Sequence, residues 1–171
     1  LVTNGQFERT LLEEDGMRLL DEITFSIDGD TPEIHDSLRG KGTYIKAIKN
    51  VNKAVELNNQ VHITTCVHRK NIGRDANGRY LLDRAIEWAA QQGADLINFH
   101  PLFKMDIARD SWTGATDVDP SNWLGVYKVI RQNIENKKYK IPVRIPQRFV
   151  TSESYNNQLD YYNFCPVKLA E

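Results

Sequence analysis

Cysteine is scarce in this chain of 171 residues, which contains only Cys66 and Cys165. The two lie almost a hundred residues apart, and a chain of this length with 40% hydrophobic residues can bury a core without disulfides. We therefore expect one ordinary domain in a reducing compartment.

Long apolar runs and an excess of one charge are also missing. No segment approaches the roughly 18 to 20 consecutive apolar residues of a membrane span, and the first residues lack the basic and apolar regions of a signal peptide. The 22 basic and 23 acidic residues leave a formal net charge of -1, which provides no field to recruit nucleic acid or an anionic membrane. We expect a cytoplasmic protein whose partner is a peptide or a small molecule.

Strand and helix patterns alternate along the chain. Residues typical of strands are enriched at 22–27, 61–67, 96–103 and 141–149, and Val2 ends a further short run. Helical patterns occur at 44–57, at 82–89, after Pro120 and, less regularly, at 7–20, where Gly16 interrupts the pattern. This alternation predicts an α/β fold with a mainly parallel sheet, either a barrel or a doubly wound sheet.

Polar residues close the predicted strands, at the place where parallel α/β folds bind their ligands. These closing segments are Thr3-Asn4-Gly5, Ser26-Ile27-Asp28-Gly29, Thr65-Cys66-Val67-His68, Asn98-Phe99-His100-Pro101 and Gln147-Arg148. They supply the candidate site residues.

The order and spacing of these segments resemble radical S-adenosylmethionine (radical SAM) enzymes of the SPASM type, such as sulfatase-maturating and peptide-modifying enzymes. The resemblance rests on Thr3-Asn4-Gly5, on Ser26-Ile27-Asp28-Gly29, on residues 33–40 and on Asn71. It implies that residues 1–150 form a partial, TIM-like (β/α) barrel of about four to five βα units, from roughly the family's third strand onward. Residues 151–171 would be a tail leading to a C-terminal extension.

The resemblance also implies roles for individual residues. Ser26 would hydrogen-bond the S-adenosylmethionine cofactor and Arg39 would meet its methionyl carboxylate, which suits a hydroxyl and a planar guanidinium. Thr65, Cys66 and His100 would lie near the cofactor's adenine or the substrate. Without the resemblance, each residue also allows a plainer role. Ser26 could hydrogen-bond the nearby backbone, Arg39 could be a solvated loop residue, and Cys66 could be a small core residue.

Five further residues have supporting roles in this interpretation. Thr3 and Asn4 would face the substrate. Asp28 is interpreted as a turn former or helix cap, and His35 and Asp36 as a hydrogen-bonded pair that stiffens the segment carrying Arg39.

The family holds a 4Fe-4S cluster on three cysteines in a Cys-x3-Cys-x2-Cys loop, and this sequence contains no such loop. The resemblance implies a parent protein that reductively cleaves S-adenosylmethionine to a 5'-deoxyadenosyl radical and modifies a peptide or small molecule. We expect the chain alone to be inactive and to bind no cofactor. Cys165 is either a first auxiliary-cluster ligand or a lone cysteine, and the open barrel edge would be paired in a homodimer, covered by rearrangement or completed by a partner.

Other interpretations remain open. A degenerate barrel could bind a nucleotide or peptide without chemistry, or the chain could belong to an unrelated α/β enzyme. His62, His68 and His100 suggest a metal-dependent hydrolase, but close histidine pairing is absent. A Schiff-base aldolase would need a strand lysine, which the predicted strands lack before their closing loops. Substrate determinants are expected outside these elements, including residues 104–112.

Overall fold

A computed structural model describes residues 1–101, 118 and 120–145 of the chain. Five parallel strands form one sheet in chain order, which confirms the predicted α/β class. The strands are β1 (Val2–Thr3), β2 (Glu22–Ser26), β3 (Gln60–Val67), β4 (Leu96–Pro101) and β5 (Val143–Arg144). The strands expected at 96–103 and 141–149 extend in part beyond the described residues, as does the proposed boundary at 150.

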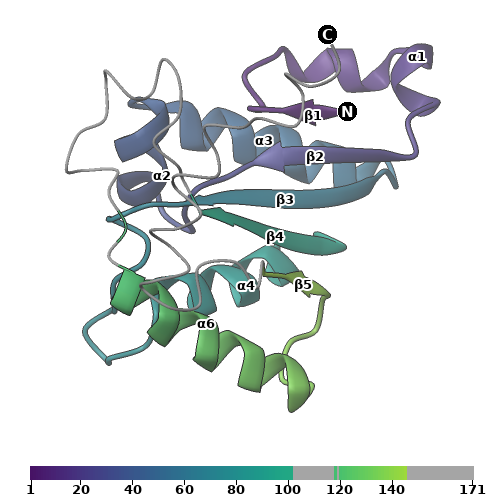
Figure 1. Ribbon diagram of the computed structural model, residues 1–171. Coiled ribbons are helices and arrows are strands. Elements are labelled where there is room, and N and C mark those ends of the chain that lie inside the picture. The colour runs from purple at the N-terminus through teal and green to yellow at the C-terminus, as the bar shows by residue number, and fades with distance from the viewer. Residues whose placement is uncertain (102–117, 119, 146–171) are drawn as a thin grey trace, which may run out of the picture.

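Helices occupy the connections between the strands (Figure 1). They are α2 (Pro32–Arg39), α3 (Thr43–Glu56), α4 (Leu81–Gln91) and α6 (Pro120–Glu135), with the short η1 (Arg9–Glu13) and α1 (Asp15–Arg18) before β2. The single helix expected at 7–20 is wrong, because Glu14 has an extended backbone (φ -65°, ψ 142°) that separates a 3-10 segment from one α-helical turn. None of the helices in the described part of the chain is long and apolar enough to cross a membrane.

Helix ends follow their local chemistry. Thr31 caps α2 by accepting a hydrogen bond from the Ile34 amide, and Pro32 occupies the first turn, so the cap is Thr31 and not Asp28. Gly93 has a φ of +81° just after α4, the left-handed conformation expected at this C-terminus. Asp119, a residue type that commonly caps a helix and that directly precedes Pro120, lies outside the described residues.

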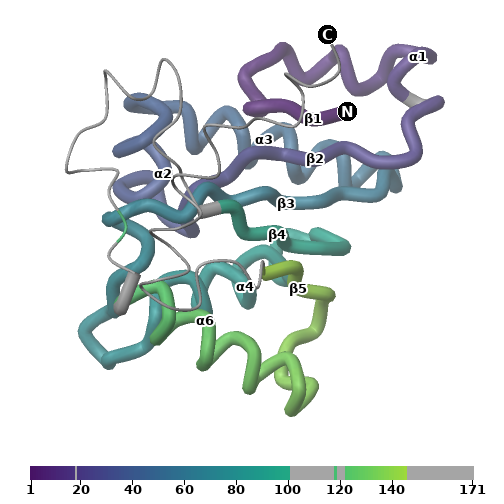
Figure 2. The backbone as a smooth tube through the Cα atoms, viewed as in Figure 1, coloured from purple at the N-terminus to yellow at the C-terminus, as the bar shows by residue number. Residues whose placement is uncertain are grey.

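One face of the sheet carries the hydrophobic core. Parallel strands in chain order require crossovers of one hand, which place the connecting helices on the same face. α3 runs along β2 and β3, α4 lies against β4 and α6 packs beside α4, as the tube in Figure 2 also shows. Side chains that point toward the helices are almost completely buried, namely Ile23, Phe25, Ile63, Ile97 and Phe99. The described helices leave the opposite face of the sheet uncovered.

Candidate functional site

The face without helices contains a hollow with a volume of about 400 Å³, within the range of small-molecule sites. Strands β1 to β5 and the end of α2 all contribute to its wall. The lining residues are Val2, Glu22, Thr24, Ser26, Arg39, His62, Ile63, Thr64, Cys66, Leu96, Asn98, His100 and Arg144. Most of them are polar, in contrast to the apolar face under the helices.

Strand register arranges these polar side chains in rows. Ser26 pairs with Thr64, Thr64 with Asn98, and Asn98 with Arg144, so one row crosses four strands at the same level. Cys66 and His100 form the next pair toward the carboxyl ends of the strands. Because alternate residues of a strand share a face, both rows point into the hollow.

Two hydroxyl groups in the first row have unused hydrogen-bonding capacity. The Thr64 Oγ1 atom is buried and has no hydrogen-bond partner among the residues that the structure describes. Ser26, which is partly exposed, also has no hydrogen bond to the described residues through its side chain. A buried hydroxyl without a partner is costly, so this position favours a ligand that can hydrogen-bond to Thr64.

Asn98 and His100 form a polar pair on β4. The Asn98 Nδ2 atom lies 2.7 Å from the Nε2 atom of His100. Partial burial lowers the pKa of His100, so the imidazole is neutral at pH 7 and can accept this hydrogen bond. β4 therefore contributes uncharged donors and acceptors to the hollow.

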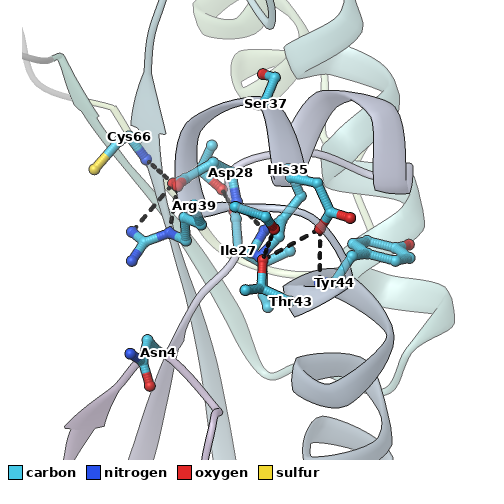
Figure 3. Close-up of polar contacts among 12 residues, drawn as sticks. Asn4, Ile27, Asp28, His35, Ser37, Arg39, Thr43, Tyr44 and Cys66 are labelled. Carbon is cyan, nitrogen blue, oxygen red and sulfur yellow. Dashed lines mark hydrogen bonds and ion pairs between the residues drawn. The ribbon is translucent and has the colours of Figure 1, made fainter.

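Asp28, just beyond β2, is the centre of a buried polar cluster (Figure 3). Its side chain is fully buried and pairs with the Arg39 guanidinium, while its Oδ1 atom accepts a hydrogen bond of 2.8 Å from the Cys66 amide. Asp28 thus joins the end of β2 to β3 and to the last turn of α2. Its role is to hold Arg39 at the hollow, which is more than the turn formation suggested by the sequence.

The backbone of Asp28 is held as firmly as its carboxylate. Its amide donates to Nδ1 of His35 over 3.1 Å, and its carbonyl accepts from Nδ2 of Asn71 over 2.9 Å. Asn71 Nδ2 also donates to the Cys66 carbonyl, and its Oδ1 atom accepts from the His68 amide. Asn71, one of the residues that carry the family resemblance, therefore fastens the segment after β3 to the end of β2.

Two buried histidines complete this cluster. His35 and His68 are each at most 1% exposed, and the Nε2 atom of each has no hydrogen-bond partner. Burial lowers the pKa of both imidazoles, and the nearby Asp28 carboxylate only partly opposes that effect. Both side chains are therefore neutral at pH 7.

Asp36 supports the junction between α2 and α3. It accepts hydrogen bonds from the Gly42 amide (2.6 Å), the Tyr44 amide (2.8 Å) and the Thr43 hydroxyl (3.2 Å), so it caps the start of α3. His35 and Asp36 have no direct hydrogen bond, which corrects the expected pair. Each nevertheless stiffens α2, the helix that carries Arg39.

Cys66 has a side chain on the hollow and a protonated thiol. Burial, followed by the Asp28 charge, raises the pKa of this thiol to about 11. A thiol is a strong ligand or nucleophile only as a thiolate, so Cys66 contributes a compact neutral surface. Among the described residues, no three histidine, cysteine or acidic side chains are grouped to hold a metal ion. Cys165 lies outside the described part of the chain.

The structure separates the expected site residues into two groups. Ser26, Arg39, Cys66 and His100 line the hollow. Thr65 points the other way, where its buried hydroxyl donates to the Ile27 carbonyl over 2.6 Å.

The Thr3 and Asn4 side chains accept hydrogen bonds from the backbone amides of Gly5 and Gln6, so they shape their own turn. Asn4 stands apart from the Asp28 cluster in Figure 3.

The sequence interpretation missed several lining residues, among them Thr64 and Arg144. The sequence did contain a signal for Thr64. Alternate residues of a strand point to the same face, and Thr65 falls in the same alternating set as the apolar residues Val61, Ile63 and Val67. That alternation assigns Thr65 to the core face and Thr64 to the open face. The position of Arg144 depended on the register between β4 and β5, which the sequence does not specify.

Solved structures of Streptococcus suis SuiB resemble this arrangement of strands and helices. The structure of SuiB itself matches with a TM-score of 0.60 and 11% identity, over 87% of this chain and 32% of SuiB. The chain shares the fold of part of SuiB. SuiB bound to S-adenosylmethionine matches equally well (TM-score 0.60, 11% identity, 87% and 33% coverage). SuiB bound to its precursor peptide SuiA gives a TM-score of 0.61 at 10% identity, over 92% of this chain and 33% of SuiB.

These matches bear on the fold alone, because identities of 10% and 11% are too low to carry over individual residues. They support the expected partial barrel, since this chain spans about a third of the SuiB chains that it matches. No protein-family model matches the sequence, and no curated protein matches it.

Proposed function

We propose that this chain provides the S-adenosylmethionine-binding wall of a radical SAM enzyme that modifies a peptide or small molecule. The observation that carries the proposal is the polar row of Ser26, Thr64 and Asn98 on the open face of the sheet, with Arg39 held beside it by Asp28. The buried Thr64 hydroxyl without a partner among the described residues calls for an explanation, and a bound ligand supplies one.

The residues present suit the chemical groups of S-adenosylmethionine. Ser26 and the buried, unpartnered Thr64 Oγ1 offer hydrogen bonds to ribose hydroxyls or to adenine, and Asn98 adds an amide. Arg39 uses part of its guanidinium on Asp28, and its remaining N–H groups are available to the methionyl carboxylate. When bound to a reduced cluster, the cofactor supplies the 5'-deoxyadenosyl radical of the family's chemistry.

The solved structures of SuiB support this proposal through the ligands that they contain. SuiB was crystallised with S-adenosylmethionine and with a precursor peptide, and its fold matches this chain in both states. The corresponding partners here would be S-adenosylmethionine and a peptide. A cluster held by three cysteines would need at least one cysteine from outside these 171 residues, because only Cys66 and Cys165 are present.

Cofactor binding can be tested by titrating S-adenosylmethionine in a calorimeter into the protein in which this chain occurs, after its cluster has been reconstituted. Thr64→Val keeps the shape of the side chain and removes the hydroxyl. We expect the affinity for S-adenosylmethionine to fall about tenfold, which is the usual effect of losing one good hydrogen bond. Thr10→Val, in the exposed η1, is the matched control and should leave affinity unchanged. Equal affinity of both variants would contradict the assigned cofactor wall.

The chemistry requires a second experiment on the protein in which this chain occurs. After anaerobic reconstitution, a radical SAM enzyme contains about four iron and four sulfide ions, and it forms 5'-deoxyadenosine from S-adenosylmethionine when reduced. Binding of S-adenosylmethionine without a cluster or cleavage would instead support the degenerate barrel that binds without chemistry.

A further inference from the structure

We propose that the β4–β5 side of the hollow, centred on Arg144, binds a carboxylate of the substrate, so that the substrate is a peptide with an acidic residue at the site. The assignment of this carboxylate to the substrate rests on the function proposed above. The anion site itself rests on the charges and register of the described residues.

Arg144 is an exposed arginine for which the described part of the chain offers no counter-ion. Within the described residues, its guanidinium has no hydrogen bond and no ion pair, although it lies on a strand in the wall of the hollow. It also lines a second, adjacent hollow of about 330 Å³, which is bounded by Asn98, Phe99, His100, Arg131, Ile134, Val143, Arg144 and Ile145. Arg144 therefore stands where the two hollows meet.

The charges around Arg144 favour an anion. Arg131 adds a second guanidinium, and its partner Glu135 lies at 3.5 Å on the exposed side of α6, where such a pair is weak. The only carboxylate lining either hollow in the described residues is that of Glu22, at the opposite end of the strands and 3.2 Å from His62. An anionic group would therefore be attracted to the β4–β5 side.

The neighbours of Arg144 suit a carboxylate on a peptide. A guanidinium binds a carboxylate through two parallel hydrogen bonds, and Arg144 has this geometry to offer at the β4–β5 side. Ile134, Val143 and Ile145 supply an apolar wall in the second hollow for the side chains that flank an acidic residue. The site thus combines one charged contact with a surface for apolar groups.

Distance separates this site from the proposed cofactor position. Ser26 and Arg144 stand three strands apart in one row, which is about 14 Å at the usual strand spacing. Arg39 lies on the Ser26 side of the hollow, next to Cys66 (Figure 3). A cofactor whose carboxylate meets Arg39 leaves Arg144 to a second molecule.

The test compares two tripeptides, acetyl-Ala-Glu-Ala-amide and acetyl-Ala-Gln-Ala-amide, which differ in one charge. Their binding to the 171-residue chain is followed by chemical shifts of the protein amides. We expect the Glu peptide to bind the unchanged chain about tenfold more tightly, as one charge-assisted bidentate contact implies. Arg144→Gln should remove this preference, Arg144→Lys should retain a smaller one, and Arg9→Gln, in the exposed η1, should leave it intact.

Several outcomes would overturn the inference. These are equal binding of the two peptides to the unchanged chain, an unchanged preference in Arg144→Gln, or a loss of S-adenosylmethionine affinity in that variant, which would assign Arg144 to the cofactor. Titration of the cluster-reconstituted protein, in which this chain occurs, with S-adenosylmethionine separates the two proposals. A protein that prefers the Glu peptide but does not bind S-adenosylmethionine when its cluster is present retains the carboxylate site and refutes the proposed function.

Discussion

The carboxylate of Asp28 has no contact with solvent, and burial of an isolated charge would cost several kcal/mol. Arg39 and the Cys66 amide compensate that cost, and the same contacts aim the guanidinium at the hollow. At the scale of single residues, stability and the geometry of the candidate site therefore depend on the same ion pair.

Removal of one partner of this pair should be costly. We expect Arg39→Ala to lower the free energy of unfolding by about 3 kcal/mol, because Asp28 would remain buried and unneutralised. Urea denaturation measures this value. Lys46→Ala removes an exposed partner of Glu8 and serves as the control, with an expected loss of no more than about 1 kcal/mol. Similar losses of stability in the two variants would show that the buried Asp28 carboxylate does not depend on Arg39 for its neutralisation.

The two buried histidines predict a stability that depends on pH. Burial lowers the pKa of His35 and His68 in the folded state, so the unfolded chain binds protons first as the pH falls. The two neutral histidines contribute their full stabilisation above the pKa of about 6.5 that histidine has in the unfolded chain. This stabilisation is lost as the pH falls below that value. We expect the free energy of unfolding to decrease between pH 7 and 5.5, where carboxylates are still ionised.

His35→Asn tests this dependence directly. The Asn side chain keeps an acceptor for the Asp28 amide and cannot take up a proton, so the slope of stability against pH should be smaller than in the unchanged chain. The overall stability of the variant will also fall, but the slope is the informative quantity. An identical slope would show that His35 does not contribute to the pH dependence of stability.

At the scale of elements, α2 determines where Arg39 and His35 lie, and Gly29 sets how closely α2 approaches β2. A Cβ atom at Gly29 would lie 2.3 Å from Ile34 Cγ2 and 3.1 Å from the His35 amide nitrogen. The distance to Ile34 is shorter than any real Cβ contact, so a side chain at this position would force the helix or Ile34 to shift. The Gly29 position therefore requires glycine for close packing of the helix.

Gly29→Ala should displace α2 and destabilise the chain by about 1 to 3 kcal/mol, the usual cost of overpacking. S-adenosylmethionine affinity should fall as well, because Arg39 moves with the helix. Gly16→Ala is the control, since no atom lies within 4 Å of its added Cβ, and helix propensity there favours alanine. Thermal unfolding of both variants measures this difference. Equal midpoint temperatures for the two variants would contradict this account.

Element positions were largely predictable because hydrophobic periodicity is local. The starts of β2, α3 and α4 lie within one residue of the expected positions. The failure at residues 7–20 has a local cause too, since Glu14 leaves helical geometry between two short turns. On β3, two successive threonines made the choice of face ambiguous until the parity of their apolar neighbours was considered.

At the scale of the whole molecule, β1 forms one edge of the described sheet. It pairs only with β2, and the Val2 side chain is 71% exposed. An edge strand with an exposed apolar side chain is prone to pair with another chain. This edge is where the sequence led us to expect a homodimer contact, a rearrangement or a partner chain.

We expect the 171-residue chain to self-associate with increasing concentration in sedimentation velocity experiments. Val2→Lys should shift the distribution toward the monomer, because a charged residue on an edge strand opposes pairing. Leu19→Lys makes the same type of change at a side chain that is 84% exposed but outside the sheet, so it should have little effect. A monomer at all concentrations would exclude pairing through β1.

The sequence by itself determined the alternation of strands and helices, the parallel class and the polar character of the strand ends, because each depends on residues within a few positions of one another. Only the tertiary structure decided that Ser26, Thr64, Asn98 and Arg144 form one row, since register between strands is a long-range property. It also decided that Arg39 reaches Asp28, eleven residues away, and that Asp28 is buried. Those contacts arise only when β2, β3 and α2 pack together, and they make a set of polar residues into a candidate site.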